Sequence, residues 1–100
     1  MAMKHLSERN FEEARGAGIA LVDFYADWCG PCRMLSPIVE AVAAERPDVL
    51  VAKVNVDENP NLAAEFGVFS IPTLVVLKDG NAVNQAVGVR PKEQILSLLS

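Results

Sequence analysis

The stretch Trp28-Cys29-Gly30-Pro31-Cys32 holds both cysteines of this 100-residue chain and lies between two strongly patterned segments. The largely apolar residues before it, 19–26, predict a buried strand. After it, residues 34–46 carry apolar side chains at helical spacing and predict a helix. A strand that delivers a Cys-x-x-Cys motif to the start of a helix indicates thiol–disulfide exchange.

The positions of the two cysteines predict a different role for each. At a helix start they face the same side, within the roughly 4.4–6.8 Å between Cα atoms that a disulfide tolerates. Cys29 lies near the unsatisfied N–H groups and the positive dipole end of the helix, which favour the thiolate and lower its pKa below the usual value of about 8.5. We therefore expect Cys29 to be the nucleophile, and Cys32, one turn further and more shielded, to be the resolving thiol.

Half of a zinc site is the alternative interpretation of the cysteine pair. Structural zinc takes four ligands, and the chain offers only these two cysteines and the distant His5. We therefore expect no metal site.

Composition limits the classes of protein to which the chain can belong. Residues 1–100 make one domain, and the hydrophobic content of 51% is ample for a packed core. The apolar runs are too short to span a membrane, and the first residues lack the apolar core of a signal peptide, so we expect a cytoplasmic protein. A net charge of −4 without a Lys/Arg cluster argues against nucleic acid as a partner.

The pattern along the chain predicts a mixed α/β sheet with helices on both faces. Asp79-Gly80 is a hairpin signal, so the last two strands should be antiparallel, whereas the β-α-β alternation before them predicts parallel neighbours. The first helix is expected to begin at about Ser7, with a competing capping box from Asn10 to Glu13. Strands are predicted over residues 3–6, 19–26, 49–56, 73–78 and 81–87, and helices over residues 7–15, 34–46, 61–66 and 91–99.

The second predicted helix should bury one continuous stripe of apolar side chains. Its members are Met34, Leu35, Ile38, Val39, Val42 and Ala43. Pro37 lies inside this helix and should kink it.

Asp23 and Lys53 are lone charges within two otherwise apolar strands, where ionised side chains are rarely buried unpaired. If the strands are neighbours, the two could form a structural ion pair. Alternatively, a desolvated Asp23 with a raised pKa could accept the proton of Cys32 during resolution. The pattern of residues does not decide between these two interpretations.

Several further motifs accompany the cysteine pair in a fixed order: Asp23, Pro37, Lys53, Ile71-Pro72-Thr73, Asp79-Gly80 and Gly88. Together they make the chain resemble the thioredoxin family, for which Cys-x-x-Cys is a standard motif. The resemblance covers nearly the whole chain and is strongest over residues 19–90.

The resemblance implies a thioredoxin fold, with strands in the order 1-3-2-4-5 and a cis Pro72 against the cysteines. The backbone of Ile71 would pair with an extended segment of a client protein. Asp23 and Lys53 would serve proton transfer. The apolar rim that binds the client would consist of Trp28, Gly30, Pro31, Ile71, Pro72 and Gly88.

The resemblance also implies partners and a source of electrons. A thioredoxin reductase using NADPH would reduce the oxidised pair, and disulfide-containing proteins would be the clients of a monomer with no bound cofactor. The chain has no Gly-rich nucleotide motif of its own. Gly30-Pro31 between the cysteines is typical of reducing members, so we expect a protein-disulfide reductase.

Two rival functions remain open at this point. A binding subunit of a larger assembly could use the same apolar rim without redox cycling, and a disulfide oxidase or isomerase would have a more oxidising potential.

Some positions depart from the commonest family pattern. Tyr25 replaces a frequent tryptophan, Phe69-Ser70 replaces a basic residue and glycine, and the segment 10–19 is short, so the first helix could be truncated.

Overall fold

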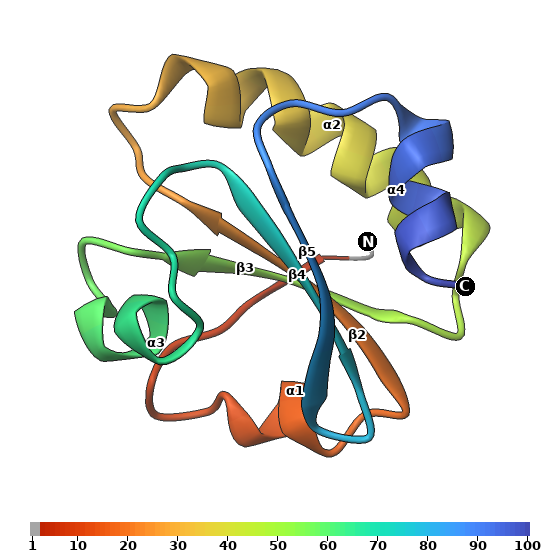
Figure 1. Cartoon of the computed structure of the whole chain (residues 1–100), viewed down its shortest axis with the longest axis horizontal. Coiled ribbons are helices and arrows are strands. Elements are labelled where there is room, and N and C mark those ends of the chain that lie inside the picture. The colour runs from red at the N-terminus through yellow and green to blue at the C-terminus, as the bar shows by residue number, and fades with distance from the viewer. Residues whose placement is uncertain (1–2) are drawn as a thin grey trace.

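The computed structural model describes residues 3–100 and centres on a five-stranded sheet in the order β1-β3-β2-β4-β5 (Figure 1). This order confirms the one implied by the resemblance. The strands are β1 (Met3–His5), β2 (Ile19–Tyr25), β3 (Leu50–Asn55), β4 (Thr73–Lys78) and β5 (Asn81–Val87). The helices are α1 (Glu12–Arg15), α2 (Gly30–Glu45), α3 (Pro60–Glu65) and α4 (Lys92–Leu98).

The sheet is mixed, as predicted. β3 is parallel to both β1 and β2. The connections that contain α1 and α2 return the chain to the same end of the sheet before β2 and β3 begin, so the three strands run in one direction. β4 pairs antiparallel with β2, and the tight turn after it makes β5 antiparallel to β4. In this register Asp23 lies between Lys53 on β3 and Leu74 on β4.

The two faces of the sheet are covered by separate helices and form separate cores. Figure 1 shows α2 and α4 on one side and α1 and α3 on the other. Since side chains alternate along a strand, Leu21 packs in the core under α2 and α4, while Val22 packs in the core with α1 and α3. Asp23 shares the face of Leu21, so its carboxyl group lies on the α2 side.

The start of α2 follows directly from the local sequence. Cys29 is the N-cap residue, with an extended backbone, and a proline occupies the first turn, where its missing N–H leaves no hydrogen bond unmade. The helix continues through Pro37 and ends before Arg46. Most of the predicted apolar stripe is buried, but Met34 is 66% exposed, so the prediction that it faces the core is wrong.

The prediction of a helix from Ser7 is also wrong, because α1 begins only at Glu12. The Asn10 side chain does not cap a helix; its Oδ1 accepts a hydrogen bond from the Ser7 N–H at 2.7 Å and closes a turn. The Phe11 ring then packs against Phe66, with 5.5 Å between the ring centroids. Local side-chain bonding and tertiary packing therefore replace the first turns of the expected helix.

None of the helices within residues 3–100 combines the length and the apolar character needed to cross a membrane.

The hairpin between β4 and β5 is the turn that the Asp79-Gly80 pair predicts. Both residues have a positive φ, 51° and 84°, as a two-residue hairpin turn with a matching twist requires. A Cβ atom on Gly80 would lie 3.1 Å from the Arg15 carbonyl oxygen. Glycine is needed here for both its φ angle and the close approach of another backbone.

Replacing Gly80 with alanine should therefore lower the free energy of unfolding by about 1–2 kcal/mol, since the side chain adds strain at positive φ and a contact with Arg15. Urea denaturation measures this change. Gly18→Ala is the matched control, because a Cβ there meets nothing within 4 Å. It should change stability by no more than about 0.5 kcal/mol. Equal stability of the two variants would contradict the argument.

Candidate active site

The cysteine pair lies where β2 leads into α2. A disulfide joins Cys29 to Cys32, with 5.3 Å between their Cα atoms. The backbone N–H of Cys32 donates a hydrogen bond to Cys29 Sγ at 3.1 Å. Cys29 therefore occupies the position at the helix start where N–H groups are directed at its sulfur.

Burial does not distinguish the two cysteines in this oxidised state. Each is 4% exposed. The difference between them lies in position, because the sulfur of Cys29 caps the helix while Cys32 lies within its first turn.

The structure brings three of the expected rim residues together, and one of them, Ile71, packs beside the cysteines. Ile71 packs against the cluster that contains Cys29 and Cys32, and the Ile71–Pro72 peptide bond is cis. The Gly88 N–H donates a hydrogen bond to the Pro72 carbonyl oxygen at 2.8 Å, which joins the end of β5 to the start of β4. Residues far apart in the sequence thus meet at one end of the sheet.

Trp28 lies on the surface next to this cluster. Its side chain is 69% exposed, and its Nε1–H donates a hydrogen bond to Asp57 Oδ2 at 2.8 Å. This exposure shows that Trp28 is a surface residue and not part of the core, while its place in a client-binding rim stays a prediction.

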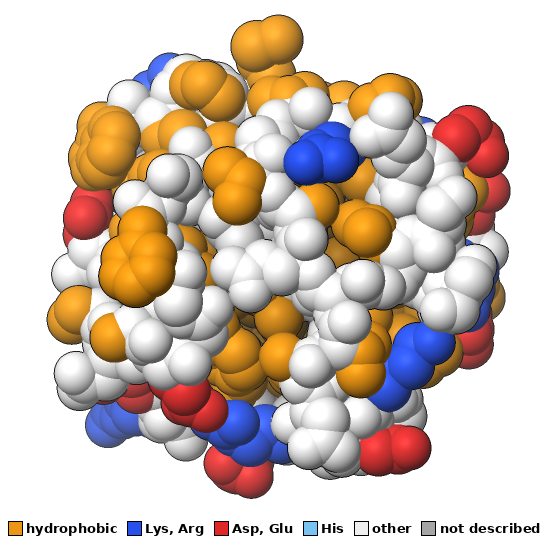
Figure 2. Space-filling view, viewed as in Figure 1, with side chains coloured by type: hydrophobic (Ala, Val, Ile, Leu, Met, Phe, Trp, Pro, Cys, Tyr) orange, Lys and Arg blue, Asp and Glu red, His pale blue; other side chains and the backbone are white. Residues whose placement is uncertain are grey.

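Phe69 is a candidate site residue that sequence reasoning missed. It is 93% exposed and precedes the Ile71–Pro72 pair. Figure 2 shows hydrophobic side chains standing out on the face in view, over the loops that lead into α2 and β4. The sequence signal for Phe69 is that Phe69-Ser70 stands where the family pattern has a basic residue and glycine.

Asp23 is fully buried in the sheet. Neither carboxyl oxygen makes a hydrogen bond within residues 3–100. Burial raises the pKa of Asp23 from 3.8 to about 6, and the positive charge of Lys53 opposes this shift. The carboxyl group therefore holds a proton to a pH close to neutral.

Lys53 does not form the direct ion pair that its neighbouring position suggested. Its ammonium group donates a hydrogen bond to Ser36 Oγ at 3.1 Å and lies 4.4 Å from the centre of the Tyr25 ring. The prediction of a structural ion pair between Asp23 and Lys53 is therefore wrong as a direct contact.

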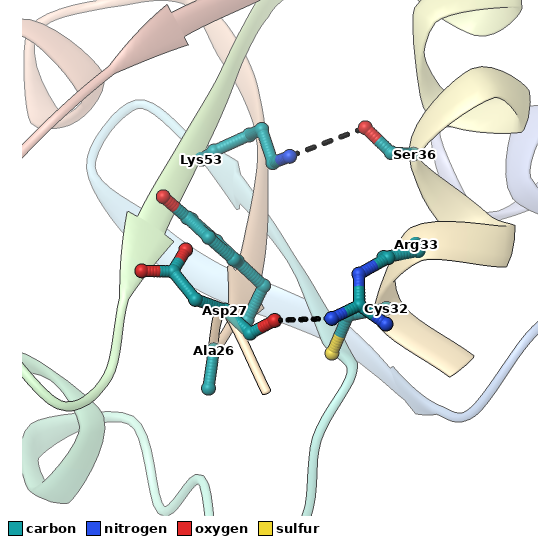
Figure 3. Close-up of a pocket in the computed structure, with 7 residues that line it drawn as sticks. Ala26, Asp27, Cys32, Arg33, Ser36 and Lys53 are labelled. Atoms are coloured by element: carbon teal, nitrogen blue, oxygen red, sulfur yellow. Dashed lines mark hydrogen bonds between the residues drawn. The ribbon is translucent and has the colours of Figure 1, made fainter. Parts of the chain in front are cut away.

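A pocket of about 250 Å³ opens between α2 and the ends of β2 and β3 (Figure 3). Arg33 borders it and donates a hydrogen bond to the carbonyl oxygen of Asp27 at 2.9 Å. The pocket gives solvent an approach to Cys32 and Lys53. It is lined by Tyr25, Ala26, Asp27, Cys32, Arg33, Ser36 and Lys53.

Across residues 3–100, no group of three or more His, Cys, Asp or Glu side chains is placed to hold a metal ion.

Comparison with known proteins agrees with this geometry. A family model described as Thioredoxin matches residues 2–100. The chain belongs to the thioredoxin family. Because the family fold carries a Cys-x-x-Cys pair at disulfide distance, the chain is a thiol–disulfide oxidoreductase whose redox-active centre is the Cys29–Cys32 pair.

Relatives with similar sequences match over nearly their whole length. The thioredoxin of Chlamydia pneumoniae is 49% identical over 98% of this chain and 96% of its own. The thioredoxin of Alicyclobacillus acidocaldarius is 50% identical over 95% of this chain and 92% of its own.

Solved structures also resemble this thioredoxin-family chain, with lower sequence identity and closely similar folds. A mutant thioredoxin from Halobacterium salinarum NRC-1 is 40% identical and superimposes with a TM-score of 0.91, over 98% of this chain and 88% of its own. A second structure concerns the thiol resolving mechanism of a yeast mitochondrial peroxiredoxin via glutathione/thioredoxin systems. One of its chains is 32% identical, with a TM-score of 0.87 over 96% of this chain and 92% of its own.

The raised pKa of Asp23 predicts that this group makes stability depend on pH. The carboxyl group keeps its proton to about pH 6 in the folded protein, whereas the unfolded chain releases it near pH 3.8. The stability that Asp23 contributes is therefore fully present below pH 3.8 and is lost as the pH rises through 6. For wild type relative to Asp23→Asn, the loss between about pH 3 and pH 8 should be about 3 kcal/mol.

Urea denaturation of both proteins across this pH range measures the loss. The two proteins are compared by how their free energy of unfolding changes with pH. Stability at a single pH is not informative, because burial of the asparagine amide in Asp23→Asn has its own cost. Parallel curves for the two proteins would contradict the raised pKa.

Proposed function

We propose that the chain reduces protein disulfides, with Cys29 as the nucleophile and Cys32 as the resolving thiol. The observation that carries this assignment is the hydrogen bond from the Cys32 N–H to Cys29 Sγ. In the reduced protein, the same amide and the helix start stabilise negative charge on Cys29, as attack on a disulfide requires.

The proposed cycle balances its electrons through two exchanges. The Cys29 thiolate attacks one sulfur of a client disulfide, forms a mixed disulfide and releases the other client sulfur as a thiolate. Cys32 then loses its proton and attacks Cys29, which breaks the mixed disulfide, releases the second client thiolate and leaves the Cys29–Cys32 disulfide. The client gains two electrons, and the chain loses two.

Asp23 is the proposed acceptor of the Cys32 proton. A general base works best when its pKa lies near the working pH, and burial brings the pKa of Asp23 to about 6. Lys53 takes part in the proposed proton transfer through its positive charge, which lowers the pKa of Asp23 without a direct contact between the two side chains.

The apolar surface around the disulfide is the proposed site for the client. Trp28, Gly30 and Pro31 would line one side of it, and Ile71, Pro72 and Gly88 the other. Exposure of Trp28 and the packing of Ile71 against the cysteines support this arrangement. The backbone of Ile71 would pair with an extended client segment.

A thioredoxin reductase using NADPH is the proposed electron source, with the chain acting as a monomer that binds no cofactor. The cytoplasm is the proposed compartment, because a disulfide reductase needs surroundings in which thiols are kept reduced.

Reduction of insulin disulfides by dithiothreitol tests the proposed direction of the reaction. Wild type should accelerate the reduction, whereas Cys29→Ser should be indistinguishable from dithiothreitol alone, because the attacking thiolate is missing. A folded wild type without activity would contradict the proposal and favour a binding subunit that uses the same surface.

Replacement of the resolving cysteine separates the two thiol roles. Cys32→Ser should accumulate mixed disulfides between Cys29 and client proteins, because attack proceeds while resolution does not. Non-reducing electrophoresis and mass spectrometry of adducts from a lysate detect them, with the Cys29→Ser/Cys32→Ser double variant as control. Adducts that form equally well with Cys29→Ser would reverse the assignment.

A further inference from the structure

The side chains of Asp23 and Lys53 lie on the same face of neighbouring strands, yet they do not contact each other. They are register partners in the parallel pairing of β2 with β3, so their Cβ atoms emerge side by side toward α2. An ammonium and a carboxylate in such positions would ordinarily attract each other strongly in a buried environment. Asp23 nevertheless finds no hydrogen-bond partner for either oxygen among the residues that the structure describes.

Two contacts hold the Lys53 ammonium elsewhere. Ser36, one turn after Cys32 on α2, accepts a hydrogen bond from Lys53 Nζ at 3.1 Å. The Tyr25 ring lies 4.4 Å from the same nitrogen. Figure 3 shows Lys53 reaching from β3 across to Ser36 on the facing helix, at the border of the pocket that Cys32 also lines.

We propose that Ser36 is a positioning residue for Lys53, whose hydroxyl holds the ammonium away from Asp23 and so keeps the Asp23 carboxylate a stronger base. The inference rests on the proposed role of Asp23 as acceptor of the Cys32 proton. The strength of this base is then set from α2. The Ser36 hydroxyl acts through its hydrogen bond with Lys53 and not through a hydrogen bond to Asp23 or to a reacting sulfur atom.

The charges around Asp23 make this mechanism specific to Lys53. Leu74, its partner on β4, is uncharged, and Tyr25 on its own strand is neutral at physiological pH because burial raises its pKa further. On α2, the cysteines ionise only when reduced. Lys53 is the charge that lowers the pKa of Asp23, against the larger effect of burial. A direct contact with an ammonium lowers the pKa of a carboxyl group by about 1–3.

The proton balance of the resolving step shows why base strength matters. The Cys32 proton moves to Asp23, the Cys32 sulfur forms the bond to Cys29, and the client sulfur leaves with the electron pair of the mixed disulfide. A carboxylate paired with Lys53 would accept this proton less readily, since its charge would already be compensated.

Titration of Asp23 in Ser36→Ala tests the proposal without using activity. The carboxyl ¹³C chemical shift of Asp23, followed by NMR in the oxidised protein, reports its ionisation while neither cysteine can titrate. Loss of the hydroxyl should let Lys53 turn toward Asp23 and lower the midpoint by about 1 pH unit. The resolution rate of a mixed disulfide at neutral pH should fall about threefold, in line with the weaker base.

Two further backgrounds separate positioning from a general structural effect. Ser36→Thr retains a hydroxyl and should restore the wild-type midpoint. In a Lys53→Met background, Ser36→Ala should cause no further shift, because the charge that it releases is gone. Ser97→Ala is the matched control, since it removes another helix serine hydroxyl with a single hydrogen bond, far from the pocket in sequence and on α4.

An unchanged midpoint in Ser36→Ala, or a shift that persists in the Lys53→Met background, would overturn the proposal. Failure of the underlying function gives a different result. If Asp23→Asn leaves the resolution rate unchanged, Asp23 is not the proton acceptor, whatever its midpoint in Ser36→Ala.

Discussion

The hydrogen bond from the Cys32 amide to the Cys29 sulfur links the fold to its chemistry. It exists because a buried strand ends where a helix begins, which leaves N–H groups of the first turn without backbone acceptors. A sulfur at the N-cap satisfies one of them. The rest of the site is arranged around this junction: Ile71 of the cis Ile71–Pro72 peptide packs against the cysteines, and Cys32 also lines the pocket.

The sheet separates this chemistry from much of the remaining structure. Alternation along β2 sends Leu21 and Asp23 toward α2, and Val22 into the core shared with α1 and α3. The buried carboxyl group of Asp23 thus lies on the same side of the sheet as α2, which carries Cys32 and Ser36 and begins at Cys29. The unfavourable burial of this polar group is tolerated because the surrounding strands are well packed, and it supplies the base that we propose for the site.

Most of the architecture could be predicted because its signals are local. The Asp79-Gly80 turn and the strand–helix alternation are read from neighbouring residues, and so is the placement of Cys29 at a helix start. Two of the failures arise because a polar side chain takes a different partner from the expected one. Asn10 bonds to Ser7 instead of capping α1, and Lys53 turns to Ser36 instead of Asp23. Exposure of Met34 depends on where α2 rests on the sheet, which periodicity alone leaves open.

The hydrogen bond of the Trp28 indole has a consequence for conformational entropy. An exposed side chain normally samples several rotamers, and a partner that packs against it must restrict them, at about 0.5–1.5 kcal/mol for each immobilised side chain. The indole of Trp28 is already bonded to Asp57, whose backbone N–H is in turn bonded to the side chain of Asn55. A protein that docks against this ring meets a preorganised surface, so more of the contact energy remains available for binding.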